Sequence, residues 1–130
     1  ASDDFTIDAD YVHSLIGDPN SIVIDVRPES FFLGEESTEA RPGHVPGAVN
    51  RPYKGDLGED GFLRPTEELL EEYRAIIPDP DVNIIVMCRT GHQASQTFFL
   101  LKHVLGYDNV KWYDASWSDW AARPELPAEM

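Results

Sequence analysis

The sequence predicts one α/β domain with a central, mostly parallel sheet flanked by helices. Two observations predict this class. Short runs rich in β-branched residues, typical of buried strands, alternate along the chain with segments of helical periodicity. The chain also has 130 residues, of which 42% are hydrophobic, and this is enough to bury the core of a single domain.

The first expected elements are a helix and a buried strand. Asp8 or Asp10 can cap a helix that extends to Gly17, because the apolar residues in between recur at helical spacing. Residues 21–26 form an apolar run rich in isoleucine and valine, which is typical of a strand buried in a parallel sheet.

Short elements and a long loop are expected next. Pro28 can open a helical turn over residues 29–33. Residues 34–47 contain several acidic residues, prolines and glycines, so we expect a long exposed loop. Residues 48–50 are expected to form a brief strand.

The rest of the chain repeats the alternation of helix and strand. A helix is expected over residues 66–77, with Thr66 as its cap. The other expected elements are a strand over residues 83–87, a helix over 94–105, a strand over 110–113 and a short helix capped by Ser116.

Acidic residues dominate the charge. The chain has 24 Asp and Glu against 10 Lys and Arg, a formal net charge of −14. Neither a nucleic acid nor an anionic membrane surface is an expected partner, because both bind basic patches. The sequence shows no run of 18 apolar residues and no visible signal peptide. We expect a cytoplasmic protein, with the periplasm as the alternative.

Cys88, the only cysteine, lies where a parallel sheet places its reactive groups. It follows the predicted strand and precedes a predicted helix, so we expect it at the carboxyl end of the sheet, facing a helix N-terminus. This environment favours the thiolate, which is the nucleophilic form of cysteine. The alternative is a buried structural cysteine, since cysteine is among the most buried residue types.

The segment CRTGHQ, residues 88–93, can form a cradle for an anion. If the segment curls tightly, successive backbone N–H groups point inward, and Gly91 permits a positive φ within the curl. A thiolate on the floor of such a cradle needs no neighbouring general base. It is suited to attack on an electrophilic sulfur or phosphorus atom.

Four segments, in the same order along the chain, resemble the rhodanese-like sulfurtransferases. They are IDVR, GHVPGAVN, CRTGHQ and YDASWSDW, at residues 24–27, 43–50, 88–93 and 113–120. The last segment, together with PELP at residues 124–127, is most similar to the C-terminal domain of two-domain thiosulfate and mercaptopyruvate sulfurtransferases. The resemblance covers about residues 6–127. It implies a single rhodanese-like domain over residues 1–130, with three layers.

The resemblance also implies a chemistry that needs no separate cofactor. Cys88 would be the catalytic nucleophile, taking a sulfane sulfur from a small anionic donor and passing it from a persulfide to cyanide or a thiol. Arg27 would bind the anionic end of the donor, with Arg89 as the second candidate. The backbone N–H groups of the loop would hold the negative charge of the persulfide, which makes binding residues of Arg89, Thr90, Gly91, His92 and Gln93.

The loop sequence favours thiosulfate as the donor. Family members that prefer thiosulfate usually have arginine and then lysine after the cysteine, and this chain has Arg89 and then Thr90. His92 would supply part of the missing charge if protonated. Because tandem members form their site between two domains, a second rhodanese-like domain or a protein acceptor is an expected partner.

Other interpretations of the same residues stay open. Arg27 could pair with Asp25, and His44 could anchor a loop instead of acting in catalysis. The four histidines and one cysteine lack the spacing of a metal site. A cysteine phosphatase would need an arginine where this chain has Ala94, which disfavours phosphate-ester hydrolysis. A relay module that accepts sulfur from a partner protein is the main alternative to an enzyme.

Overall fold

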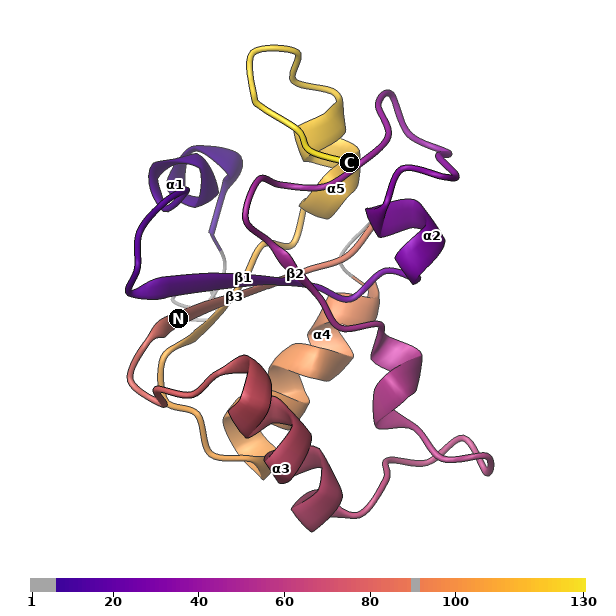
Figure 1. Ribbon diagram of the computed structural model, residues 1–130, viewed down its shortest axis with the longest axis vertical. Coiled ribbons are helices and arrows are strands. Elements are labelled where there is room, and N and C mark those ends of the chain that lie inside the picture. The colour runs from indigo at the N-terminus through magenta and orange to yellow at the C-terminus, as the bar shows by residue number, and fades with distance from the viewer. Residues whose placement is uncertain (1–6, 90–91) are drawn as a thin grey trace.

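The computed structural model describes residues 7–89 and 93–130, together with the backbone of His92. The described residues form a sheet of four strands in the order β2-β1-β3-β4, and every pair of neighbours is parallel. The predicted parallel sheet is therefore confirmed (Figure 1). The strands are β1 (Ser21–Asp25), β2 (Val49–Asn50), β3 (Asn83–Met87) and β4 (Val110–Trp112).

Helices cover both faces of the sheet and give the domain three layers (Figure 1). One face is covered by α1 (Ala9–Ser14) and α5 (Ser116–Ala121). The other face is covered by α3 (Thr66–Ile76) and α4 (His92–Phe99). The predicted α/β class with helices on both sides of the sheet is confirmed.

The described residues also form three shorter helical elements. α2 (Glu29–Phe32) and the 3-10 helix η2 (Tyr53–Asp56) follow β1 and β2, and the π-helix η3 (Leu100–Val104) continues α4. At the end of η3, the backbone N–H of Leu105 donates to a carbonyl 2.9 Å away and five residues earlier. The helix predicted over residues 94–105 is therefore present, but its last part is wider than an α-helix.

The central strand β3 divides the core between the two faces. Ile84 and Val86 pack with α3 and α4, whereas Ile85 and Met87 pack with α1 and α5. All four side chains are fully buried, as expected for a central strand of a parallel sheet. Cys88 continues the alternation and belongs to the cluster on the α3 and α4 side.

The three predicted helix caps have different outcomes. Asp8 caps α1 as predicted, and its carboxylate accepts a hydrogen bond from a backbone N–H of the first turn at 3.0 Å. The prediction for Thr66 is wrong, because Pro65 is the N-cap and Thr66 is already the first residue of α3. The prediction for Ser116 is also wrong, because Ser116 is the first residue of α5 and its hydroxyl is bonded outside the helix.

Arg41 fastens the long loop between α2 and β2 to the C-terminal tail. The indole N–H of Trp117 donates to the carbonyl of Arg41 at 3.1 Å, which holds the loop against α5. The guanidinium of Arg41 donates to four backbone carbonyls at 2.8–3.1 Å, those of Trp120, Ala121, Arg123 and Leu126.

His44 anchors the same loop. Its ring stacks on Phe32 with the ring centroids 3.7 Å apart, and its backbone forms an antiparallel bridge with Glu129. Gly43 must be a glycine here, because its φ is +104° and a Cβ would lie 2.2 Å from the carbonyl oxygen of Glu129. This placement supports the interpretation of His44 as a loop anchor.

A buried carboxylate joins η2 to α3. Asp56 is fully buried and accepts hydrogen bonds from the hydroxyl of Tyr73 and the guanidinium of Arg51, each at 2.9 Å. Arg51 also donates to Glu72 at 2.8 Å, and Arg64 pairs with the same carboxylate. Burial raises the pKa of Asp56, whereas the hydrogen bond from Arg64, followed by that from Arg51, lowers the pKa of Glu72 to about 2.

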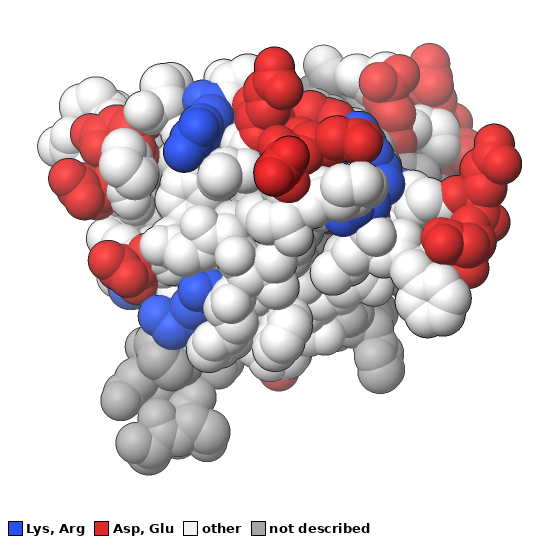
Figure 2. All heavy atoms as spheres, turned by 90° about the horizontal axis from the view of Figure 1, so that it is seen from below, with Lys and Arg blue, Asp and Glu red and all other residues white. Residues whose placement is uncertain are grey.

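The surface reflects the acidic composition. In Figure 2 carboxylates form several groups around an uncharged centre, and basic side chains are fewer. None of the helices in the described part of the chain is long and apolar enough to cross a membrane. Within residues 7–89 and 93–130, no group of three or more potential ligands could hold a metal ion.

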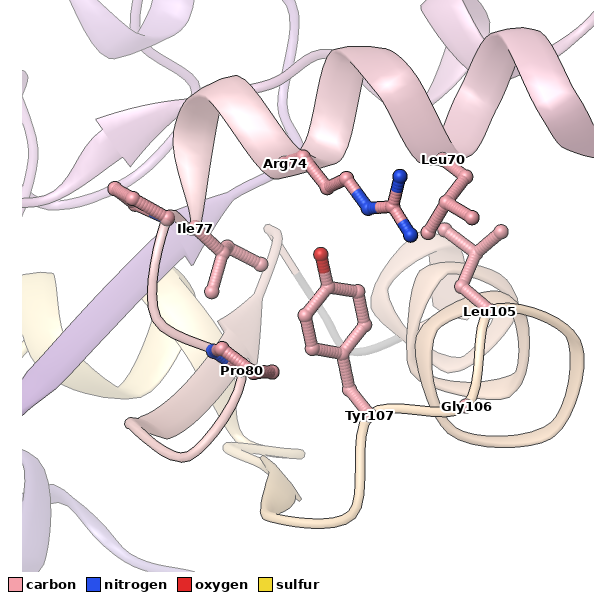
Figure 3. Close-up of a pocket in the computed structure, with 8 residues that line it drawn as sticks. Leu70, Arg74, Ile77, Pro80, Leu105, Gly106 and Tyr107 are labelled. Carbon is pink, nitrogen blue, oxygen red and sulfur yellow. The ribbon is translucent and has the colours of Figure 1, made fainter.

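A surface pocket of about 270 Å³ lies at the amino ends of β3 and β4, where its lining includes Ile77, Pro80 and Leu105. Figure 3 shows Tyr107 pointing into it with the hydroxyl toward Arg74 of α3. Cys88 follows the opposite, carboxyl end of β3, so this pocket is separate from the predicted site.

Candidate active site

Cys88 directly follows β3, at the carboxyl edge of the sheet. The end of β1 lies beside it, because the backbone N–H of Val26 donates to the carbonyl of Met87 at 2.9 Å. The predicted position at the end of a buried central strand is confirmed. In an open parallel sheet, this edge is where the connecting segments form binding sites.

The side chain of Cys88 is buried. Only 1% of the residue is exposed, and it packs in the cluster that includes Ala94 of α4 and Val86 of β3. Burial alone is also expected of a cysteine with a purely structural role. The evidence for a reactive Cys88 is therefore its position at the sheet edge and the contacts of its backbone.

The first residues of α5 hold the backbone of Cys88 on two sides. The hydroxyl of Ser116 accepts a hydrogen bond from the N–H of Cys88 at 3.0 Å and donates to the carbonyl of Tyr113 at 2.8 Å. The N–H of Trp117 donates to the carbonyl of Cys88 at 2.9 Å. Both polar groups of the Cys88 backbone are therefore satisfied by α5.

Ser116 adopts an unusual backbone conformation for this role. Its φ is +54°, in the left-handed region, and it is the one residue other than glycine with positive φ in the described part of the chain. The residue is fully buried, and its hydroxyl oxygen lies 4.0 Å from the sulfur of Cys88. Sequence reasoning missed this contact and treated Ser116 only as a helix cap.

Arg27 is enclosed by other groups. Only 3% of it is exposed, and its Nε and Nη2 donate to the carboxylate of Asp25 at distances down to 2.7 Å. Nη2 also donates to the carbonyl of Gly43 at 2.7 Å, and the guanidinium lies over the ring of Trp117, 4.8 Å from its centroid. The structure therefore favours the alternative in which Arg27 pairs with Asp25.

Asn50, at the end of β2, supports the same corner. Its side-chain amide donates to the carbonyls of Asp25 and Arg27, at 3.0 and 2.9 Å. These bonds fix the segment that follows β1, at the point where the chain leaves the sheet. Sequence reasoning assigned no role to Asn50, although it lies in a predicted strand and ends the segment 43–50 that resembles the rhodanese-like family.

Arg89 lies at the surface. It is 56% exposed along its side chain, and its Nε pairs with Oε1 of Glu39 at 2.7 Å. Its backbone carbonyl accepts a hydrogen bond from the N–H of Ser118 at 2.9 Å. Of the two arginines predicted to bind a donor, Arg89 is therefore the accessible one, but its guanidinium is already paired with the carboxylate of Glu39.

The other predicted binding residues are only partly described. Gln93 is half-buried in the first turn of α4, and His92 is the first residue of that helix. Thr90, Gly91 and the side chain of His92 lie outside the described residues. The cradle of backbone N–H groups around a persulfide therefore stays a prediction.

Ala94 bears on the phosphatase alternative. It is fully buried against the core. The position at which a cysteine phosphatase needs its phosphate-binding arginine is thus occupied by a small apolar side chain that packs inside the protein.

Comparisons with known sequences give one family. The family described as "Rhodanese-like domain" matches residues 8–123. A protein of Mycolicibacterium smegmatis, provisionally named a thiosulfate sulfurtransferase, is 36% identical over 129 residues, covering 93% of this chain and 46% of that protein. The sulfur carrier protein TtuD of Thermus thermophilus is 36% identical over 113 residues, covering 81% and 40%. The chain therefore spans less than half the length of these relatives.

Solved structures show the same fold. The wild-type structure of EanB has a TM-score of 0.87 and 23% identity, covering 97% of this chain and 31% of that one. The anaerobic ergothioneine biosynthesis enzyme from Chlorobium limicola, bound to trimethyl histidine, has a TM-score of 0.87 and 24% identity, covering 97% and 32%.

Proposed function

The chain belongs to the rhodanese-like family, and we propose that it is a sulfurtransferase that carries a sulfane sulfur as a persulfide on Cys88. The observation that supports this most directly is the placement of Cys88. It follows the central strand at the carboxyl edge of the sheet, and α5 binds both polar groups of its backbone. This arrangement fixes the position from which a sulfur atom could accept and donate a second sulfur.

The proposed donor is thiosulfate. The Cys88 thiolate attacks the outer sulfur of thiosulfate, a new S–S bond forms on Cys88, the S–S bond of thiosulfate breaks, and sulfite leaves with the electron pair. Cyanide or a thiolate then attacks the outer sulfur of the persulfide. The product is thiocyanate or a new persulfide, and the electron pair returns to the sulfur of Cys88. No separate cofactor enters this cycle.

Two relatives support this assignment at different levels. The Mycolicibacterium smegmatis relative is provisionally named a thiosulfate sulfurtransferase, whereas the Thermus thermophilus relative is named a sulfur carrier protein. The second name favours one further candidate function, a relay in which the donor is a persulfide of a partner protein, which leaves as a thiolate, or the acceptor is a thiol of a partner protein. Both functions use the same persulfide on Cys88, so they differ only in the partner.

The proposal is tested by the intact mass of the protein after incubation with thiosulfate. The wild-type chain should gain one sulfur atom, and subsequent cyanide should remove it and release thiocyanate. The variant Cys88→Ser should gain no sulfur and form no thiocyanate while melting as a folded protein. Because Cys88 is 1% exposed, this experiment also tests whether the sulfur becomes accessible in solution.

Two results would contradict the proposal. One is a wild-type protein that gains no sulfur from any donor, and the other is thiocyanate formation by Cys88→Ser at the wild-type rate. Hydrolysis of an aryl phosphate by the wild-type protein but not by this variant would favour the phosphatase alternative instead.

A further inference from the structure

We propose that Glu39 is a specificity-determining residue that disfavours doubly charged sulfur donors by neutralising Arg89. The inference rests on the proposed function and concerns the charge of the donor: pairing with Glu39 weakens the binding of dianionic thiosulfate more than that of a sulfane compound with one negative charge. Glu39 lies in the long loop between α2 and β2, and no sequence pattern pointed to it.

Glu39 and Arg89 form a close ion pair. Oε1 of Glu39 lies 2.7 Å from Nε of Arg89. The Glu39 side chain is only 17% exposed, whereas that of Arg89 is 56% exposed. Because Glu39 is largely enclosed, its carboxylate is less screened by water than an ordinary surface carboxylate.

The loop that holds Glu39 is fixed in place. Ser37 donates to the carbonyl of Arg41 at 3.3 Å, which closes a short turn around Glu39. Arg41 is in turn bound to the end of α5 and to the tail by four hydrogen bonds. Glu39 is thus presented to Arg89 by a tethered segment.

The other arginine at this edge of the sheet, Arg27, is also paired with a carboxylate. Arg27 is buried and its charge is balanced by Asp25. Both arginines that the sequence offered to an anionic donor are therefore paired with carboxylates. A thiosulfate dianion that approaches Arg89 must compete with Glu39, and it does so against a chain of net charge −14.

The pairing of Arg89 with Glu39 should weaken the binding of a donor with a single negative charge less than that of a dianion. In methanethiosulfonate, a methyl group replaces one oxygen of thiosulfate, and the anion carries a single negative charge. The Cys88 thiolate attacks its outer sulfur, the S–S bond breaks, and methanesulfinate leaves with the electron pair. The persulfide on Cys88 is the same as that formed from thiosulfate, so the two donors differ only at the charged end.

The test compares the two donors in matched variants. Glu39→Gln removes the charge and keeps the size of the side chain. Glu36→Gln is the control, because it removes one charge from the same loop, where Glu36 accepts a hydrogen bond from Ser30, whereas Arg89 is paired with Glu39. The measured quantity is kcat/KM for thiosulfate divided by kcat/KM for methanethiosulfonate, from thiocyanate formation.

We expect Glu39→Gln to raise this ratio about two- to fivefold, the range expected for a partly exposed ion pair. Glu36→Gln should leave the ratio near the wild-type value. In an Arg89→Gln background, adding Glu39→Gln should change the ratio no more than the control does, because there is then no cation to release.

Three results would overturn the inference. They are an equal increase for both donors, an equal effect of Glu36→Gln, and an undiminished effect in the Arg89→Gln background. Failure of the proposed function is distinguishable, because a wild-type protein that forms no persulfide with either donor yields no ratio to compare. Thermal melting of each variant confirms that the ratios describe folded protein.

Discussion

Ser116 accepts a hydrogen bond from the backbone N–H of Cys88 at 3.0 Å, although the two residues are 28 positions apart in the sequence. Ser116 reaches this position with a φ of +54°. The start of α5 thus sets where the end of β3 lies, and a buried donor that would otherwise be unsatisfied is paired.

Substitution of Ser116 should reveal both parts of this arrangement. Ser116→Gly removes the hydroxyl but tolerates the positive φ, and we expect a loss of about 1–3 kcal/mol in unfolding free energy from the unpaired N–H of Cys88. Ser116→Ala should lose about 1 kcal/mol more, because alanine is strained in this conformation. Urea denaturation measures both losses, and wild-type stability of Ser116→Gly would contradict the prediction.

Arg27 should act on stability more than on substrate affinity. Arg27→Met leaves the carboxylate of Asp25 buried without its partner, and removal of one member of a buried pair costs about 3–5 kcal/mol. The double variant Asp25→Asn with Arg27→Met should recover part of this loss. A variant that unfolds like the wild type but needs more thiosulfate for half-maximal rate would instead assign Arg27 to the donor.

Arg41 should be needed for the attachment of the tail. Arg41→Gln removes a guanidinium that donates to four carbonyls, and we expect a loss of about 2 kcal/mol or more in unfolding free energy. Arg123→Gln is the control, since the exposed guanidinium of Arg123 pairs with Asp119 four residues earlier, and its loss should cost about 0.5 kcal/mol or less. Equal melting temperatures of the two variants would show that the four hydrogen bonds of Arg41 do not stabilise the attachment of the tail.

Glu72 should stabilise the fold in a pH-dependent way. The pKa of this carboxyl is lowered from 4.5 to about 2 by hydrogen bonds from Arg64 and then Arg51. A lowered pKa gives stability that is fully present above the unfolded value and is lost as the pH falls through the folded value. The difference in unfolding free energy between wild type and Glu72→Gln should thus be largest above pH 4.5 and shrink toward pH 2.

The matched control for this titration is Glu67→Gln, which changes an exposed carboxylate on the same helix. Its difference from the wild type should vary less between pH 6 and pH 2 than that of Glu72→Gln. A Glu72→Gln difference that stays constant across this range would show that the charge of Glu72 does not stabilise the fold.

The sequence predicted the features that depend on neighbouring residues. The strand that ends at Cys88 and the cap at Asp8 follow from local hydrophobicity and hydrogen bonding, and both are present. The contacts of Ser116 and Arg41 join residues 28 to 85 positions apart, so no local pattern could reveal them. For Arg27 the sequence left two interpretations open, and burial beside Asp25 favours one of them.

The borders of the sheet have a consequence for self-association. At one border β2 contains only two residues, and Pro52 follows it closely without a backbone N–H to donate. At the other border β4 contains three residues, and the carbonyl of Trp112 already accepts from Ile7. Within the described residues, neither border offers a long row of free peptide groups on which another copy could add a strand, so we expect concentrated solutions to resist fibril formation.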